Sequence, residues 1–120
     1  MSLFRVNLQI ADPRNTAVVS PQINALVDTG SELTWVPAAV LEAIGILRLK
    51  KKTFLTASNQ TLFRDVGYVV IRAEGFETID EAVFAEPSDM TLLGVRTLEG
   101  FSAIVETLGR KLVATTTIAA

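Results

Sequence analysis

The most informative segment of the chain is Ala25-Leu26-Val27-Asp28-Thr29-Gly30-Ser31, in which an apolar strand delivers an acid directly into a tight turn. A carboxylate at the end of a buried strand must be hydrogen-bonded or paired, because an isolated charge is costly to move into a low-dielectric interior. Gly30 permits close backbone approach, Thr29 offers a hydroxyl that can tie the loop down, and Ser31 can donate to the carboxylate. Two interpretations stand on these residues alone: Asp28 caps an ordinary turn, or it is an acid held in place for chemistry.

A second segment, Leu92-Leu93-Gly94, lies late in the chain and consists of an apolar pair that ends in glycine. Taken alone, it is typical of a buried strand end. Together with the Asp28 segment it carries a family resemblance, described below, which favours the interpretation of Asp28 as a functional acid.

Composition predicts one folded domain over residues 1–120 and excludes several kinds of chemistry. Hydrophobic residues make up 49% of the chain and charged residues 20%, which suits a globular core. The formal net charge of −2 argues against a nucleic-acid partner, which requires a basic face. The chain has no cysteine and no histidine, so thiolate nucleophiles, Ser–His–Asp triads and sulfur or imidazole metal sites are all excluded. Carboxylates are therefore the leading catalytic candidates.

No segment of the sequence is typical of membrane insertion or export. The first residues lack an apolar run of signal-peptide length, and no later run approaches the ~20 apolar residues of a membrane span. We therefore expect no membrane partner and a cytoplasmic location.

The spacing of apolar residues predicts a mainly β fold with one short helix and a short C-terminal helical turn. Phe4, Val6, Leu8 and Ile10 alternate with polar residues, as in a half-buried strand. Pro21 places part of the next strand at an edge or bulge. Pro37 and Gly45 bracket the helix. The expected elements are strands over 4–10, 16–27, 79–84 and 90–93, a hairpin of 50–57 and 61–73 about 58–60, a helix over 38–44, a helical turn over 97–101, and a final hairpin over 103–116 about Gly109.

These segments together resemble the retropepsin-type aspartic proteases, the single-domain family that includes retroviral proteases and bacterial relatives. The resemblance rests on the Asp28-Thr29-Gly30-Ser31 signature behind an apolar strand, on Trp35-Val36-Pro37 leading into the predicted helix, and on Leu92-Leu93-Gly94. It implies a closed β-barrel with one lobe per chain. It also implies that Leu92, Leu93 and Gly94 pack beneath the catalytic loop.

One copy of the signature implies a homodimer, because the family's chemistry needs two carboxylates and one chain supplies one. In such a dimer, Asp28 and its counterpart activate a water that attacks the peptide bond, and neither a metal nor an organic cofactor is implied. The resemblance assigns Thr29 to locking the two loops together. It assigns Ser31 to a hydrogen bond with the Asp28 carboxylate.

The part of the predicted hairpin over residues 50–65 falls where the family carries its flap. Its tip, Ala57-Ser58-Asn59-Gln60, is expected to close over an extended peptide. The tip lacks the glycines common in the family, and Asn59 can take the left-handed conformation in place of one. Glu32 either reaches substrate backbone N–H groups or is an ordinary solvated glutamate.

Two further positions carry alternatives. No N-terminal arm is evident before the first strand, so residues 103–116 are expected to supply most of the dimer interface. The alternative is that their apolar side chains, Ile104, Leu108, Leu112 and Val113, close the core of the monomer. Trp35 either lines a substrate pocket or fills the core beside the helix, and the core position is favoured.

Two classes of function follow. The first is a dimeric aspartic endopeptidase that cleaves extended peptides at apolar sites under mildly acidic conditions, as the resemblance implies. The second is a noncatalytic module that keeps the fold for dimerisation or peptide binding. The intact Asp28 signature favours the first, because a binding platform has no need of a buried acid pair.

Overall fold

A computed structural model of the protein describes residues 4–116. Within this range there are ten strands and two helices. In chain order they are β1 (Arg5–Asp12), β2 (Asn15–Val19), β3 (Ile23–Val27), β4 (Thr34–Pro37), α1 (Ala38–Ala43), β5 (Lys50–Leu55), β6 (Thr61–Ala73), β7 (Phe76–Ala85), β8 (Leu92–Leu93), α2 (Val95–Phe101), β9 (Ala103–Glu106) and β10 (Lys111–Ala114).

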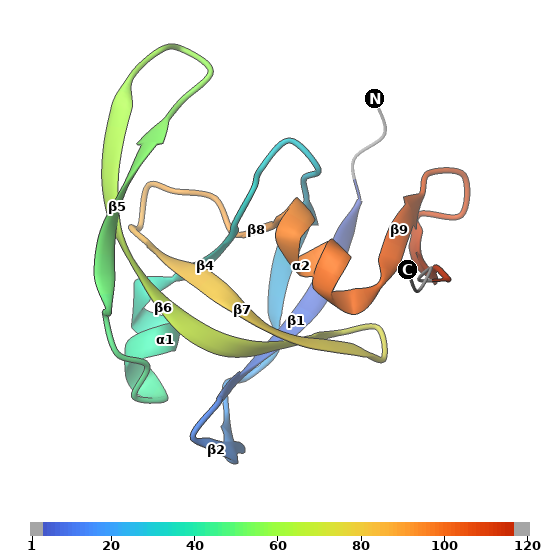
Figure 1. Cartoon of the computed structure of the whole chain (residues 1–120), viewed down its shortest axis with the longest axis horizontal. Coiled ribbons are helices and arrows are strands. Elements are labelled where there is room, and N and C mark those ends of the chain that lie inside the picture. The colour runs from blue at the N-terminus through green and yellow to red at the C-terminus, as the bar shows by residue number, and fades with distance from the viewer. Residues whose placement is uncertain (1–3, 117–120) are drawn as a thin grey trace, which may run out of the picture.

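The strands form a closed barrel (Figure 1). Eight strands pair in the order β2-β1-β3-β8-β4-β7-β6-β5, and β1 also pairs with β6. This additional pairing closes a ring of six strands, β1, β3, β8, β4, β7 and β6, with β2 and β5 attached outside it. The pairs β3–β8 and β4–β7 are parallel, and the remaining pairs are antiparallel. The mainly β class and the closed barrel predicted from the sequence are confirmed.

The barrel interior is filled by alternate residues of its strands. On β1, Val6, Leu8 and Ile10 are 3%, 0% and 0% exposed, so the predicted two-residue alternation is confirmed. They pack with large side chains from the other ring strands and from both helices. Fully or almost fully buried members include Val36, Leu41, Val69, Ile71, Phe84, Leu93 and Leu98.

Helix α1 ends as the sequence predicts. Gly45 follows it with φ +80°, a left-handed conformation that glycine adopts without steric cost. The Gly45 N–H donates to Glu42 O, and the Ile46 N–H donates to Leu41 O, which together form a Schellman motif. Both helices are short, and within residues 4–116 neither is long and apolar enough to cross a membrane.

The single strand predicted over residues 16–27 is wrong, because the structure divides it into β2 and β3. Pro21 lies in the break and has no N–H for a ladder hydrogen bond. The preceding Ser20 closes the break instead: its N–H donates to Ile10 O, and its Oγ accepts from the Ile10 N–H. β2 is therefore an exposed edge strand, whereas β3 lies in the barrel wall and leads to Asp28.

Two other elements are longer than the sequence predicts. The helical turn expected over 97–101 is the seven-residue helix α2, which begins directly after Gly94. The strand expected over 79–84 is the ten-residue β7, paired with β6 through a tight turn. Glu74 and Gly75 occupy this turn with φ of 49° and 84°, the two positive values that a short hairpin of this kind requires.

The final hairpin, β9 and β10, forms a small sheet of its own at one side of the barrel (Figure 1). Its apolar residues divide between two environments. Leu112 is 7% exposed and joins the core, whereas Ile104 and Leu108 are 56% and 97% exposed. Arg110, not Gly109, takes the left-handed conformation in the turn. The interpretation that this hairpin only closes the monomer's own core is therefore wrong for its exposed members.

Replacing Leu8 by alanine is expected to lower the free energy of unfolding by about 2–5 kcal/mol, because the deletion leaves a cavity in a closed barrel. The matched Leu47→Ala, at a leucine 57% exposed, is expected to change it by less than about 0.5 kcal/mol. Urea unfolding at one fixed protein concentration measures both. Equal effects of the two substitutions would contradict the assigned core.

Candidate active site

Strand pairing places Asp28 beside the Leu92-Leu93-Gly94 segment. β3 runs parallel to β8 with Leu26 opposite Leu92 and Val27 opposite Leu93. The ladder continues past the end of β3, where the Asp28 N–H donates to Leu93 O at 3.0 Å. The backbone of the acid is thus held by the second segment, although the two lie far apart in the sequence.

The Asp28 side chain is held by its own loop. Its Oδ1 accepts a hydrogen bond from the Gly30 N–H at 2.9 Å, and the Ser31 N–H donates to Asp28 O at 3.1 Å. A Cβ atom at position 30 would lie 3.2 Å from Oδ1, so glycine leaves this close approach unobstructed. The carboxylate is half-buried in the single chain, and the neighbouring Thr29 is exposed.

The predicted hydrogen bond from Ser31 to the Asp28 carboxylate is wrong in this chain. Ser31 Oγ donates to Leu33 O at 2.8 Å. A hydroxyl has one proton to donate, so that proton goes to the start of β4 instead of to the acid. Ser31 therefore fixes the course of the loop, and the Gly30 N–H is the donor that orients Asp28.

The first residues of α2 hold the other side of the loop. The Val95 N–H donates to Ser31 O at 2.8 Å, and the Arg96 N–H donates to Glu32 O at 3.1 Å. A Cβ atom at Gly94 would collide with the Leu33 carbonyl and lie 2.9 Å from Ser31 O. Only glycine fits at this contact, which explains why the apolar pair ends in glycine.

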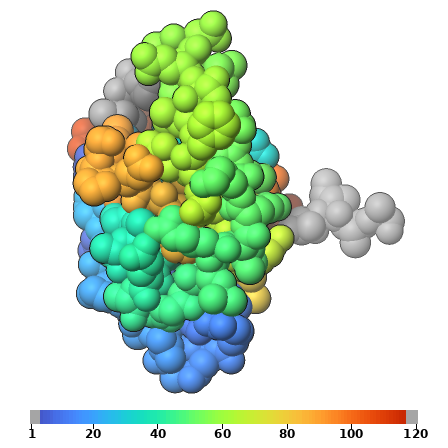
Figure 2. Space-filling view, turned by 90° about the vertical axis from the view of Figure 1, so that its left-hand side faces the viewer, coloured from blue at the N-terminus to red at the C-terminus, as the bar shows by residue number. Residues whose placement is uncertain are grey.

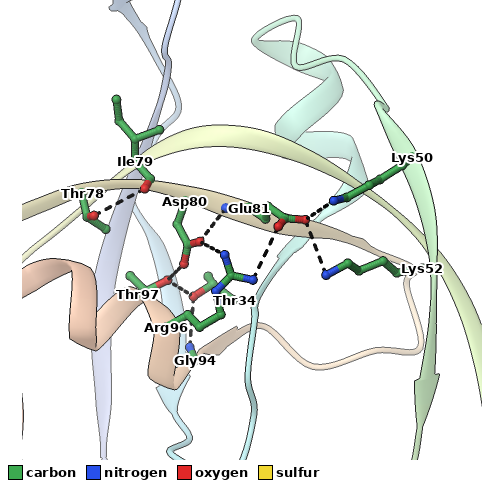
Figure 3. A network of polar contacts seen from close by, with 10 residues as sticks. All are labelled: Thr34, Lys50, Lys52, Thr78, Ile79, Asp80, Glu81, Gly94, Arg96 and Thr97. Carbon is green, nitrogen blue, oxygen red and sulfur yellow. Dashed lines mark hydrogen bonds and ion pairs between the residues drawn. The ribbon is translucent and has the colours of Figure 1, made fainter.

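A buried chain of hydrogen bonds runs from Gly94 into the barrel wall (Figure 3). The Gly94 N–H donates to Thr34 Oγ1 at 3.0 Å, Thr34 and Thr97 hydroxyls lie 2.6 Å apart, and Thr97 Oγ1 donates to Asp80 Oδ2 at 3.1 Å. Because Thr97 gives its proton to the carboxylate, Thr34 donates to Thr97. Both threonines are fully buried, so every member of the chain has its partner.

Three cations surround the two adjacent acids on β7 (Figure 3). Arg96 reaches both, with nitrogen–oxygen distances of 3.3 Å to Asp80 and 3.5 Å to Glu81. Lys50 and Lys52 on β5 lie 3.3 and 3.7 Å from Glu81 Oε2. Burial opposes ionisation of Glu81, but the three cations outweigh it and lower the pKa of this carboxyl below its ordinary value. The cluster connects β5 to β7 and α2.

A groove of about 730 Å³ opens beside Asp28. One wall consists of the Asp28 loop with Trp35, another of the β5–β6 hairpin, and a third of the segment before and within β8. The rings of Trp35 and Phe54, which both line the groove, have centroids 5.0 Å apart and planes tilted by 58°. The lining residues are Asp28, Gly30, Ser31, Glu32, Leu33, Trp35, Lys52, Thr53, Phe54, Leu55, Thr56, Ala57, Leu62, Asp89, Met90 and Leu92.

The structure brings some of the predicted substrate-binding residues to this groove and leaves others outside it. Glu32 and Ala57 line it. Ser58, Asn59 and Gln60 are exposed at the hairpin tip and do not line it.

The hairpin tip differs in length from the prediction but not in backbone conformation. The Thr56 N–H donates to Gln60 O, so the tip spans residues 56–60 instead of 58–60 and Ala57 lies outside the strand. Asn59 takes φ 65°, as the sequence predicts for a left-handed position without glycine.

Sequence reasoning missed several residues of the groove. Trp35 is not one of them, because it meets both alternatives given for it: it packs on the buried cluster of Leu33, Val66 and Val83 and also lines the groove. Lys52, Thr53, Phe54 and Leu55 line it from four consecutive positions of β5, so the two-residue periodicity of a strand does not single them out. Asp89 and Met90 lie in the segment before β8, because the strand predicted over 90–93 is wrong in its first half and β8 comprises only Leu92 and Leu93. Within residues 4–116, no three acidic side chains gather as metal ligands would.

Comparisons with solved structures bear on the fold of the chain. Simian foamy virus (mac) protease is similar at 22% identity and a TM-score of 0.54, over 79% of this chain and 91% of that one. EIAV protease in complex with the inhibitor HBY-793 is similar at 20% identity and a TM-score of 0.54, over 93% of each chain. The chain has the retropepsin-like fold.

Other comparisons set the extent of this likeness. The foamy viral protease-reverse transcriptase in complex with RNA/DNA hybrid matches 98% of the retropepsin-like chain at 16% identity and a TM-score of 0.58. The match covers only 13% of that larger protein. No protein-family model and no curated protein sequence matches the chain.

Replacing Gly94 by alanine is expected to destabilise the retropepsin-like fold by about 1–3 kcal/mol, because the methyl group overpacks against the Leu33 carbonyl. Gly75→Asn serves as the control, since position 75 has open space and asparagine tolerates its positive φ. Thermal and urea unfolding of both variants check the expectation. A Gly94→Ala variant as stable as Gly75→Asn would contradict the close contact.

Glu81→Gln is expected to flatten the acid side of the stability profile. Since the folded pKa of Glu81 lies below its ordinary 4.5, the unfolded chain takes up protons first as the pH falls. The stabilisation from this charge is present above about pH 5 and is lost as the pH falls through the folded pKa. Urea unfolding from about pH 7 to about pH 3 measures the slope. Identical slopes for wild type and variant would contradict the role of the cation cluster.

Proposed function

We propose that the chain is one half of a homodimeric aspartic endopeptidase that hydrolyses extended peptides. The observation that carries the proposal is the position of Asp28: it stands at the end of a barrel strand, held by the Gly30 N–H and Leu93 O, at the side of a peptide-sized groove. A carboxylate held in this way is oriented for chemistry, and no histidine or cysteine competes for the role.

A second copy supplies the second carboxylate. Two carboxylates held close together cannot both ionise easily, so they share one proton, a behaviour for which aspartic-protease dyads are the standard example. The ionised member takes a proton from a bound water as the water attacks the scissile carbonyl. The protonated member donates to the carbonyl oxygen, and a proton then passes to the leaving amine as the peptide bond breaks.

The arrangement of exposed elements supports this dimer. The flap tip, the loop between β3 and β4, and the turn between β9 and β10 all project on the same side of the barrel (Figure 1). Ile104 and Leu108 leave large apolar surface exposed on β9 and its turn. A second copy that covers these residues about a two-fold axis would bring the two Asp28 loops together. The exposed Thr29 would then meet the loop of the other copy.

The groove supports an extended peptide with apolar side chains as substrate. Trp35, Phe54, Leu62 and Leu92 supply apolar lining, and the hairpin supplies strand backbone for pairing with a peptide. Glu32 lines the same groove with an exposed carboxylate that would accept from a peptide N–H.

The test compares wild type with Asp28→Asn on casein between about pH 4 and about pH 7. Asparagine keeps an oxygen for the Gly30 N–H, so the variant is expected to fold and dimerise while its rate of cleavage falls by about 10²–10⁴-fold. Glu77→Gln, an exposed acid remote from the groove, is the matched control and should cleave as wild type does.

Three outcomes would contradict the proposal. Equal cleavage by Asp28→Asn and wild type would remove the assigned mechanism. A sedimentation run that finds only 13.0 kDa species at high micromolar concentration would remove the shared site. Confirmed dimers without cleavage by wild type would favour the noncatalytic dimerisation or peptide-binding module instead.

A further inference from the structure

Arg64 and Asp89 form a bidentate ion pair next to the groove. Arg64 Nε donates to Asp89 Oδ2 at 2.7 Å, and Nη2 donates to Oδ1 at 2.9 Å. Their side chains are 10% and 11% exposed. In every other ion pair of residues 4–116, at least one of the two side chains is more exposed than these. Paired forks of this kind combine strength with defined geometry.

Both partners are held in place by further contacts. The Glu86 N–H donates to Asp89 Oδ2 at 2.8 Å, and the Asp89 N–H donates to Glu86 O at 2.8 Å, so the carboxylate closes its own turn. On the other side, Arg64 Nη1 donates to Phe63 O at 2.9 Å. The Asp89 carboxylate therefore accepts three hydrogen bonds, two from the Arg64 side chain and one from the Glu86 N–H.

The pair connects two walls of the groove that have no strand pairing with each other. Arg64 lies on β6, two residues from the groove-lining Leu62. Asp89 and Met90 line the groove from the segment between β7 and β8. The space-filling view shows this segment, in orange, directly against the green hairpin (Figure 2). The hairpin is thus anchored at Arg64, and residues 55–62 form its far end, where Leu55, Thr56, Ala57 and Leu62 line the groove.

We propose that the Arg64–Asp89 pair is a latch that sets the width of the groove and the point from which the flap moves, so that both are positioning residues for peptide binding. The peptide-binding part of this inference rests on the proposed function. Asp28 is held by different groups, namely Gly30 and Leu93. Loss of the latch therefore loosens substrate binding and leaves the catalytic acid in place.

Hydrogen exchange by mass spectrometry tests the latch without reference to activity. In Asp89→Asn and Arg64→Lys, the amides of residues 55–62 are expected to exchange about tenfold faster than in wild type, because the bidentate anchor is lost. Asparagine at position 89 keeps an acceptor for the Glu86 N–H, which preserves the turn. Arg72→Lys disrupts an exposed arginine–carboxylate pair with Glu77, remote from the groove, and is the control with unchanged exchange.

Steady-state kinetics on one apolar peptide test the positioning role. Both variants are expected to raise KM about five- to tenfold with kcat within about twofold of wild type. The double variant should resemble either single variant, because each substitution alone already removes the bidentate pair. Arg64 has one further ionic contact, at 3.5 Å to Glu86 Oε1, and Asp89→Asn leaves that contact in place.

Unchanged exchange over residues 55–62 in both variants would overturn the latch, as would a fall in kcat at constant KM. Faster exchange with the expected KM effect supports it. Should wild type cleave no peptide, the proposed function fails, and the exchange measurement still decides whether the latch exists.

Discussion

The parallel pairing of β3 with β8 is the contact on which the candidate site depends. It places the Asp28 N–H within hydrogen-bond distance of Leu93 O, and it places Gly94 against the carbonyls of Leu33 and Ser31. Because Gly94 has no side chain, the start of α2 lies close enough to the Asp28 loop to donate two backbone N–H groups to it. The backbone of the acid is therefore held by β8, and the Gly30 N–H of its own loop orients the carboxylate.

Next to this contact, starting at Gly94, the barrel wall contains buried polar side chains where most of the core is apolar. The hydrogen-bond chain through Thr34 and Thr97 ends on Asp80, and Arg96 links Asp80 to Glu81 and its lysines. Buried polar groups cost free energy unless each one is satisfied, and a satisfied network holds one geometry. The network joins β4, α2 and the first residues of β5. The loop that carries Asp28 and the hairpin that forms one wall of the groove are therefore connected through the same polar contacts.

Sequence reasoning succeeded where a property is local. Alternation on β1 identified buried residues, the Gly45 stop followed from backbone sterics, and Asn59 takes the left-handed conformation expected of it. It failed where one atom had to choose between partners. Ser31 was expected to donate to Asp28, but Leu33 O lies within reach and takes the proton. For Trp35 the two alternatives given by the sequence both hold, since it packs on a buried cluster and also lines the groove.

Four features can be read from the residues and their order: the mainly β class, the acid in its Thr-Gly turn, the absence of thiol and imidazole chemistry, and the resemblance to retropepsins. These follow from residue identity, short-range periodicity and the steric needs of glycine and proline. The tertiary structure alone decided which hydroxyl protons go where, which residues line the groove, and that Arg64 meets Asp89 across two of its walls. Such contacts join segments distant in the sequence, and their partners are selected by the closing of the barrel, which no local pattern of residues encodes.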